Sequence, residues 1–368
     1  MIKRNGANER IKRRYLQHLK ETKGRDEASL DAVAKAIARF EDHAKNRDFK
    51  KFHVEQARAF KAHLASTRSE RTSESLSAST VYSTLAALKS FFAWLAQQRG
   101  YRSRINVADA EYFNAPDNLS RVATARRYKA CPTVKQVRAM LAALPAGDEL
   151  QLRDRAVIAF ALVSGARDGA IVSFKLKHID VENELIEQDA REVRTKRAKT
   201  FTTWFFPVGD DIRKIFIDWV VFLREQKGFG PEDALFPKSK VAPGYDLAFR
   251  AVGLDRETWA NASPVRAIFK KACALADLPY FNPHSIRSTL VQLAYDRKLD
   301  AEQFKAWSQN LGHDNCLTTF PSYGEIQPSR QAEIIRGLAK PIEATDGHVP
   351  PDLLRRLVEQ LERNGAAP

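Results

Sequence analysis

Residues 281–288 read Phe-Asn-Pro-His-Ser-Ile-Arg-Ser, and this stretch points most directly to the fold of the second half of the chain. Asn282 is a favoured residue before a helix and Pro283 suits its first position, so a helix is predicted to start here. His284 and Arg287 are three residues apart and share a face of the first turn. The same turn presents unbonded backbone N–H groups and the positive end of the helix dipole. Together these features predict an anion site, most simply for phosphate.

A second cationic residue follows a predicted buried helix. Residues 152–163 are apolar nearly all round, which is typical of a helix inside a core. The helix is expected to break at the following Ser-Gly pair, and Arg167 opens a further helix that leads to Leu176. A charge at such a place needs an anion or a carboxylate, and an internal ion pair with Asp168 is the alternative. The His-x-x-Arg pair has its own alternative, an ion-pairing surface arginine beside a capping histidine.

The third notable stretch, residues 311–324, reads Leu-Gly-His-Asp-Asn-Cys-Leu-Thr-Thr-Phe-Pro-Ser-Tyr-Gly. Tyr323 lies between Ser and Gly beyond a Pro, so we do not expect it inside a regular helix. A positive pocket would make its hydroxyl more acidic and a better nucleophile. The alternatives are packing at a domain edge for Tyr323 and helix capping for His313.

The first part of the chain has the pattern of a small helical bundle. The spacing of its apolar residues predicts four helices, over residues 8–23, 27–45, 54–66 and 79–99. Residues 114–131 show no consistent period and are predicted to be an interdomain linker. We therefore place a first domain at residues 1–113.

The second part is predicted to mix helices and strands. Thr133 is expected to cap a helix from Val134 to Leu144. Further along the period changes, and three short strands are predicted, over residues 184–189, 191–196 and 200–208. From Asp211 the pattern is helical again, with interruptions. The fold class is α+β, mainly helical with a small antiparallel sheet; a second domain covers residues 132–340, and residues 341–368 form a link and a terminal amphipathic helix.

Positive charge is concentrated in the first half. The net charge is +15; residues 1–130 hold 27 Lys and Arg against 14 Asp and Glu, and the remaining residues hold 33 against 31. A domain that lies along a polyanion would have this asymmetry, which favours double-stranded DNA as the partner. A solvated surface is the alternative. An anionic membrane fits less well, because the basic segments also carry full apolar faces that a core would use.

Several classes of protein do not fit the sequence. It has no apolar run long enough to span a bilayer and no signal-peptide core at its start, so we expect a cytoplasmic protein without a membrane segment. Cys131, Cys273 and Cys316 are scattered, which indicates neither a disulfide framework nor a metal cluster. There is no Walker-type loop or clustered metal-ligand motif, and we expect no cofactor and no metal.

The order of these segments resembles the phage integrase, or tyrosine recombinase, family. A Ser-Gly-x-Arg turn, a lysine on a β-hairpin, His-x-x-Arg, Leu-Gly-His and Thr-Thr-x-x-x-Tyr follow one another. The resemblance covers about residues 132–340 and extends by architecture to the basic helical domain. It implies a C-shaped clamp on DNA, made of an N-terminal helical core-binding domain and a mixed α/β catalytic domain. By position it implies six catalytic residues: Arg167, Lys196, His284, Arg287, His313 and Tyr323.

The match has two departures and one open choice. Ala170 stands where the family usually has an acidic residue, and Asp168 is a candidate replacement. The interval from His313 to Tyr323 is one residue longer than usual. Lys199 lies across the presumed turn from Lys196 and remains the alternative hairpin lysine.

The resemblance implies strand cleavage through a 3′-phosphotyrosyl link without metal or ATP. It also implies a homotetramer on DNA, in which the terminal helix docks on a neighbour; docking on its own domain is the alternative. Two other functions share parts of the pattern. One is a type IB topoisomerase, and the other is a non-catalytic DNA-binding relic.

Overall fold

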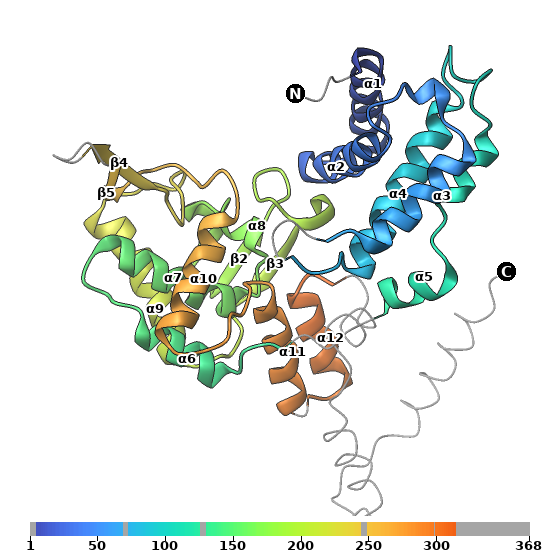
Figure 1. Ribbon diagram of the computed structural model, residues 1–368. Coiled ribbons are helices and arrows are strands. Elements are labelled where there is room, and N and C mark those ends of the chain that lie inside the picture. The colour runs from blue at the N-terminus through green and yellow to red at the C-terminus, as the bar shows by residue number, and fades with distance from the viewer. Residues whose placement is uncertain (1–4, 69–72, 126–129, 244–248, 298, 314–368) are drawn as a thin grey trace, which may run out of the picture. The chain divides into compact units, whose positions relative to one another are not determined.

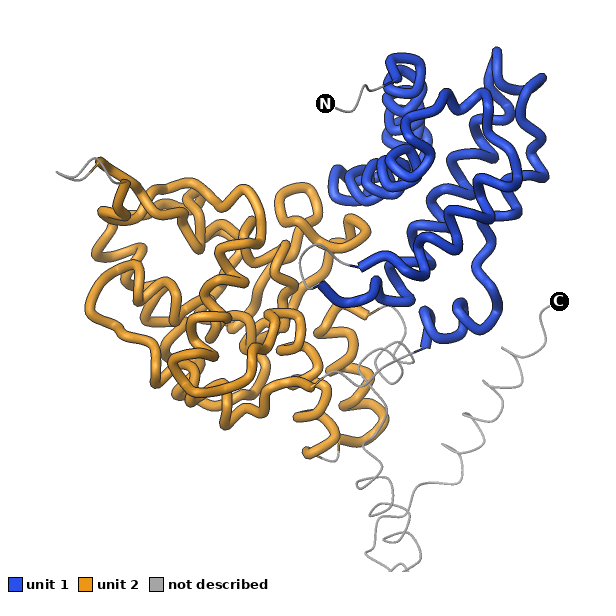
Figure 2. Tube along the Cα trace, in the orientation of Figure 1, with its two compact units in different colours: residues 1–126 blue, residues 127–368 orange. Residues whose placement is uncertain are grey.

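The structure is a computed structural model that describes residues 5–68, 73–125, 130–243, 249–297 and 299–313. The chain divides into two compact units, Met1–Arg126 and Arg127–Pro368 (Figure 2). Among the described residues, no helix is long and apolar enough to cross a membrane.

Unit 1 is a helical bundle around an aromatic core. Phe92 lies at its centre, with ring centroids 4.0, 5.1 and 5.3 Å from those of Phe52, Phe40 and Phe113. The four predicted helices are confirmed, although the last ends at Leu95, earlier than expected. The α-helices are α1 Gly6–Lys23, α2 Glu27–His43, α3 Val54–Ser66, α4 Ala78–Leu95 and α5 Asp117–Thr124, with 3-10 turns at Phe49–Lys51 and Val107–Phe113 (Figure 1).

The prediction that residues 114–131 form an irregular linker is wrong for their first half. Helix α5 occupies Asp117–Thr124 and packs along α4. Its Leu119 and the preceding Ala115 lie against the core of unit 1. An eight-residue helix with two such contacts is too short to show a period, which explains why the sequence pattern did not reveal it.

Unit 2 is built around the buried helix α7. All of its residues from Ala156 to Ser164 are buried, as the apolar pattern predicted. Thr133 caps α6 through a reciprocal bond with Gln136. The α-helices are α6 Val134–Ala143, α7 Glu149–Ser164, α8 Asp168–Ile171, α9 Asp210–Val221, α10 Ser263–Leu275, α11 Ser285–Asp296 and α12 Ala301–Asn310, and a π-helix at Phe222–Gln226 follows α9.

The helix expected to run from Arg167 to Leu176 stops after one turn, so that prediction is wrong. α8 ends at Ile171, and the chain then runs extended beside residues 233–235. There Leu235 N donates to the carbonyl of Phe174 over 2.9 Å, and Leu176 N to that of Asp233 over 3.0 Å. These bonds to a distant segment replace the next helical turn before a 3-10 turn at Leu176–His178.

A three-stranded antiparallel sheet precedes α9, in the order β1 Ile179–Asp180, β2 Leu185–Gln188 and β3 Phe201–Trp204. The first and third predicted strands correspond to β2 and β3, and β1 was missed. The predicted strand over residues 191–196 is wrong, because these residues lie in the loop between β2 and β3. Val193 is buried and anchors this loop in the core, which explains the misleading alternation. A second hairpin, β4 Ser239–Pro243 with β5 Phe249–Leu254, was also missed.

Candidate active site

Arg287 is the centre of the candidate site. Its side chain is only 2% exposed, which is unusual for a charged residue. Nη1 donates to the carbonyl of Gly165 over 2.5 Å, and Nη2 donates to the carbonyl of Leu311 over 2.6 Å. Nη2 also lies 2.9 Å from Nε2 of His313. One guanidinium therefore joins the three stretches that the sequence analysis singled out.

The contact with Arg287 fixes the state of His313. A guanidinium only donates hydrogen bonds, so Nε2 of His313 must be the acceptor. At this contact Nε2 therefore carries no proton. His313 is buried, and its N–H bonds to the carbonyl of Ser308.

His284 lies immediately before α11 and not inside it. The regular α-helix begins at Ser285, two residues later than predicted, after a tight turn that is opened by the predicted capping residue, Asn282. Its side-chain oxygen accepts from Ser285 N over 3.2 Å, and its carbonyl accepts from Ser285 Oγ over 2.6 Å. The turn places the exposed His284 at the mouth of the site, while Arg287 points into the core.

Positive charge surrounds His284. Desolvation lowers the pKa of this histidine, and so do the charges of Arg287, Arg167 and Lys196, whereas Asp168 opposes the shift. Four of the predicted site residues are thus within electrostatic range of one another, and the imidazole is neutral at neutral pH.

Gly165 allows the end of α7 to pack closely against Leu311 and Leu290. It ends α7 in the left-handed region, with φ of 60°. A Cβ at this position would lie 2.8 Å from Cδ2 of Leu311 and 3.0 Å from Cδ1 of Leu290. A side chain would therefore be both strained and crowded, which is the physical reason for the Ser-Gly break. Arg167 follows two residues later, half-buried at the start of α8.

Asp168 has a partner in the structure that sequence reasoning missed. Its Oδ2 accepts from Nε and Nη2 of Arg266 on α10, over 2.9 and 2.8 Å. The ion pair between Asp168 and Arg266 links α8 to α10. Its two residues are 98 positions apart, so no local pattern in the sequence indicates the pair. Ala170, at the position where the family usually has an acid, is buried.

The two candidate lysines lie in different surroundings. Lys199 Nζ donates to the carbonyl of Gly312 over 3.2 Å and lies 5.7 Å from the ring centroid of Phe201. Lys196 opens the 3-10 turn Lys196–Ala198, is exposed, and is the lysine whose charge acts on His284. Lys196 is therefore the exposed lysine of the two, and Lys199 is bonded to the segment that follows α12.

Family models match both units. The model of the phage integrase family matches residues 133–330, and that of the phage integrase N-terminal SAM-like domain matches residues 13–99. The chain belongs to the phage integrase family. It is a tyrosine-type site-specific recombinase, which breaks and rejoins DNA strands.

Solved recombinases share the fold. A lambda integrase dimer bound to a core site is 14% identical, over 87% of this chain and 96% of that chain, with a TM-score of 0.56. The Tn1549 transposon integrase with transposon right end DNA is 16% identical, over 89% and 99%, with a TM-score of 0.55. XerH recombinase bound to a palindromic difH substrate is 15% identical, over 85% and 80%, with a TM-score of 0.57. A search among curated proteins gave no match.

Two parts of the recombinase lie outside the described residues. These are Tyr323, the expected nucleophile, and the expected terminal helix after residue 341. Among the residues that the structure does describe, no group of three or more His, Cys, Asp or Glu side chains is placed to hold a metal ion.

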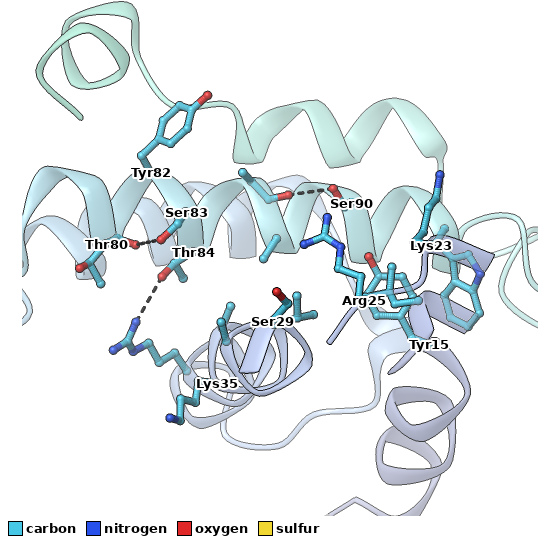
Figure 3. A pocket seen from close by; sticks show the side chains of 18 of the residues that line it. Tyr15, Lys23, Arg25, Ser29, Lys35, Thr80, Tyr82, Ser83, Thr84 and Ser90 are labelled. Atoms are coloured by element: carbon cyan, nitrogen blue, oxygen red, sulfur yellow. Dashed lines mark hydrogen bonds between the residues drawn. The ribbon is translucent and has the colours of Figure 1, made fainter. Parts of the chain in front are cut away.

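Unit 1 of the recombinase has a basic groove between α1, α2 and α4 (Figure 3). Its volume is about 850 Å³, and its cationic residues are Lys23, Arg25, Lys35 and Arg39. Hydroxyl groups of Thr80 and Ser83 on α4 lie along the same groove, as do the aromatic rings of Tyr82 and Trp94. The net charge of the sequence predicted a basic half, but only the packing of the helices collects these cations on one surface. We call this surface the basic groove.

Proposed function

We propose that this recombinase cleaves DNA by transferring a phosphodiester to Tyr323, giving a 3′-phosphotyrosyl link, and that it does so without metal or ATP. The observation that carries the proposal is the Arg287 guanidinium, buried and bound by the carbonyls of Gly165 and Leu311. The two carbonyls orient this cation. A guanidinium held in a fixed orientation is the type of group that binds phosphate oxygens and stabilises the charge that develops on them.

Each group has one task in the proposed reaction. Arg287 and Arg167 bind the non-bridging oxygens and stabilise the charge that develops at phosphorus. Neutral His284 takes the phenolic proton of Tyr323, whose oxygen then bonds to phosphorus. The bond from phosphorus to the 5′-oxygen breaks, and the ammonium of Lys196 protonates that oxygen. His313 holds a phosphate oxygen. Rejoining is the reverse of these steps, so the phosphotyrosyl bond conserves the energy.

The basic groove is proposed to bind duplex DNA. Its lysines and arginines match the phosphate backbone, and the hydroxyls of α4 are short donors and acceptors for phosphates or base edges. The three similar structures above are recombinases bound to DNA, which supports double-stranded DNA as the partner.

Covalent trapping tests the proposal. The substrate is a nicked site duplex, selected from a random pool by its capture on the wild-type chain. Wild-type protein is expected to form an adduct that survives denaturing gels, with or without EDTA. Tyr323→Phe is expected to bind the duplex and form none. An adduct with the Phe variant would show that another residue is the nucleophile, and loss of the adduct in EDTA would refute the metal-free mechanism.

We also propose assembly as a homotetramer on DNA through the terminal helix. Residues 353–361 carry an apolar stripe of Leu and Val that a short helix must bury against another surface. Deleting residues 350–368 is expected to abolish paired-site complexes in gel shift while single-site binding stays within about threefold of wild type. General loss of binding with a lower melting temperature would instead show docking on its own subunit.

A further inference from the structure

The outer edge of β3 is bound by a side chain. Among the described residues, β3 pairs with one strand, β2. At Trp204 the backbone N–H donates to Oδ1 of Asn310 over 2.7 Å, and Nδ2 of Asn310 donates to the Trp204 carbonyl over 2.9 Å. The primary amide therefore satisfies both groups that a further strand would otherwise bind.

The backbone of Asn310 adds a second attachment to the same strand. Thr203 Oγ1 donates to the Asn310 carbonyl over 3.0 Å and accepts from Nε2 of Gln188 over 2.9 Å. Thr203 is fully buried and its bond to Gln188 is shielded from water, while its bond to the Asn310 carbonyl is partly buried. Asn310 thus fixes the sheet to the end of α12 with both its side chain and its main chain.

The residues directly after Asn310 belong to the active site. The Leu311 carbonyl accepts from Arg287, the Gly312 carbonyl accepts from Lys199, and His313 meets Arg287. Gly312 has φ of 73°, and a Cβ there would lie 2.5 Å from Cζ of Phe201. The segment 310–313 therefore holds β3 on one side and the arginine on the other.

This arrangement sets the position of Lys196. The first half of its loop is anchored by Arg194, whose N–H donates to Ser173 Oγ over 2.9 Å and whose Nη1 donates to the Ala260 carbonyl over 2.7 Å. The second half leads directly into β3 through a tight turn, with φ of 61° at Arg197 and 50° at Ala198. A displacement of β3 is therefore transmitted to Lys196.

We propose that Asn310 is a positioning residue for proton donation: its amide fixes the edge of β3 to α12 and so keeps Lys196 within reach of the leaving 5′-oxygen. The inference rests on the proposed function, in which Lys196 is the proton donor. Asn310 itself makes no contact with DNA in this proposal. Its effect on the reaction is exerted through the sheet, so a loss of the amide should impair leaving-group protonation and spare the contacts of Arg287.

The test compares two nicked site duplexes, one with the normal scissile phosphate and one with sulfur in place of the leaving 5′-oxygen. A thiolate leaves without a proton, so a defect in donation disappears on sulfur. Asn310→Ala is expected to cleave the normal duplex about 10- to 100-fold more slowly in single turnover, as a small misplacement of a catalytic group does. On the sulfur duplex the cleavage rate of Asn310→Ala is expected to lie within about threefold of the wild-type rate. Gln309→Ala, on the exposed neighbouring residue, is the matched control and should equal wild type on both.

Asn310→Asp provides a second variant of nearly the same size. It keeps the acceptor for Trp204 N–H but sets a carboxylate oxygen against the Trp204 carbonyl, so its cleavage rate on the normal duplex should also fall, again with rescue by sulfur. Equal defects on both duplexes, or a wild-type rate for Asn310→Ala, would overturn the inference. Lys196→Ala is measured in parallel. If sulfur rescues Lys196→Ala but neither Asn310 variant, only the Asn310 inference fails; if sulfur does not rescue Lys196→Ala, the proposed donor itself is wrong.

Discussion

The two units present positive charge in opposite ways. In unit 1 the cations surround a groove over an aromatic core, and no single one of them organises the fold. In unit 2 the decisive cation, Arg287, is buried and bound by two backbone carbonyls that come from distant segments. Exposed charges attract a polyanion additively and are screened by salt, whereas a buried guanidinium acts through fixed geometry. The difference predicts that equal substitutions will have unequal effects in the two units.

The largest effect is expected from exchanging arginine for lysine at Arg287. Lysine has one donor centre in place of the planar fork, so it cannot bind both the Gly165 and the Leu311 carbonyls with the same geometry. Arg287→Lys should slow cleavage by about 10²- to 10³-fold, the cost of removing a transition-state donor. The matched change in the basic groove, Arg39→Lys, should leave the cleavage rate within about threefold of the wild-type rate. Comparable losses of cleavage rate for Arg287→Lys and Arg39→Lys would contradict the distinction between buried charge in unit 2 and exposed charge in unit 1.

The second effect separates two lysines of one loop. Lys196→Ala should lower the cleavage rate on normal DNA by about 10²-fold, which is typical of a missing general acid. The rate should recover on the sulfur duplex. Lys199 instead bonds the Gly312 carbonyl, so Lys199→Ala should show a smaller loss that sulfur does not rescue. Single-turnover rates of both variants on both duplexes identify the proton donor. Rescue of Lys199→Ala by sulfur, without rescue of Lys196→Ala, would make Lys199 the donor.

A smaller effect is expected for each cation of the groove. Residues 1–126 should bind duplex DNA without unit 2, with an affinity that falls steeply as salt rises. Changing Lys35 or Arg39 to Gln should reduce the slope of log K against log salt by about one and leave single-turnover cleavage at saturating protein unchanged. Fluorescence anisotropy at several salt concentrations measures the slopes. Binding indifferent to salt would contradict the proposed role of the groove.

The smallest effect concerns pH. The pKa of His284 is lowered, so the neutral, proton-accepting form persists below the usual value of 6.5. Cleavage should therefore stay constant as pH falls to that value and decline only below it. Asp168 opposes the shift, so Asp168→Asn should lower the pKa of His284 further. The acidic limb of the pH–rate profile, where the rate declines, should then move to lower pH. This limb should be absent in His284→Gln. An acidic limb above pH 6.5, or one unchanged by His284→Gln, would exclude His284 as the base.

Among the elements of unit 2, predictability depended on the range of the interactions. Helix α7 and the Thr133 cap of α6 follow from apolar period and local capping, so the sequence predicted both. The loop that holds Val193 was mistaken for a strand, because one buried side chain produces the same alternation as a pleated strand. The hairpin of β4 and β5 was missed, since its pairing is decided by partners along the chain and not by a local period.

The sequence by itself determined which residues are available to the site: the arginines, histidines and lysines occur in stretches whose order resembles a recombinase, and the charge lies mostly in the first half. Only the tertiary structure decided their relations. It brought the Gly165 and Leu311 carbonyls to Arg287, made His313 an acceptor, paired Asp168 with Arg266, and placed Asn310 on the edge of β3. Each of these contacts joins residues far apart in the chain, where no local period or spacing records the partner, because hydrogen-bond geometry is set by the packing of whole elements.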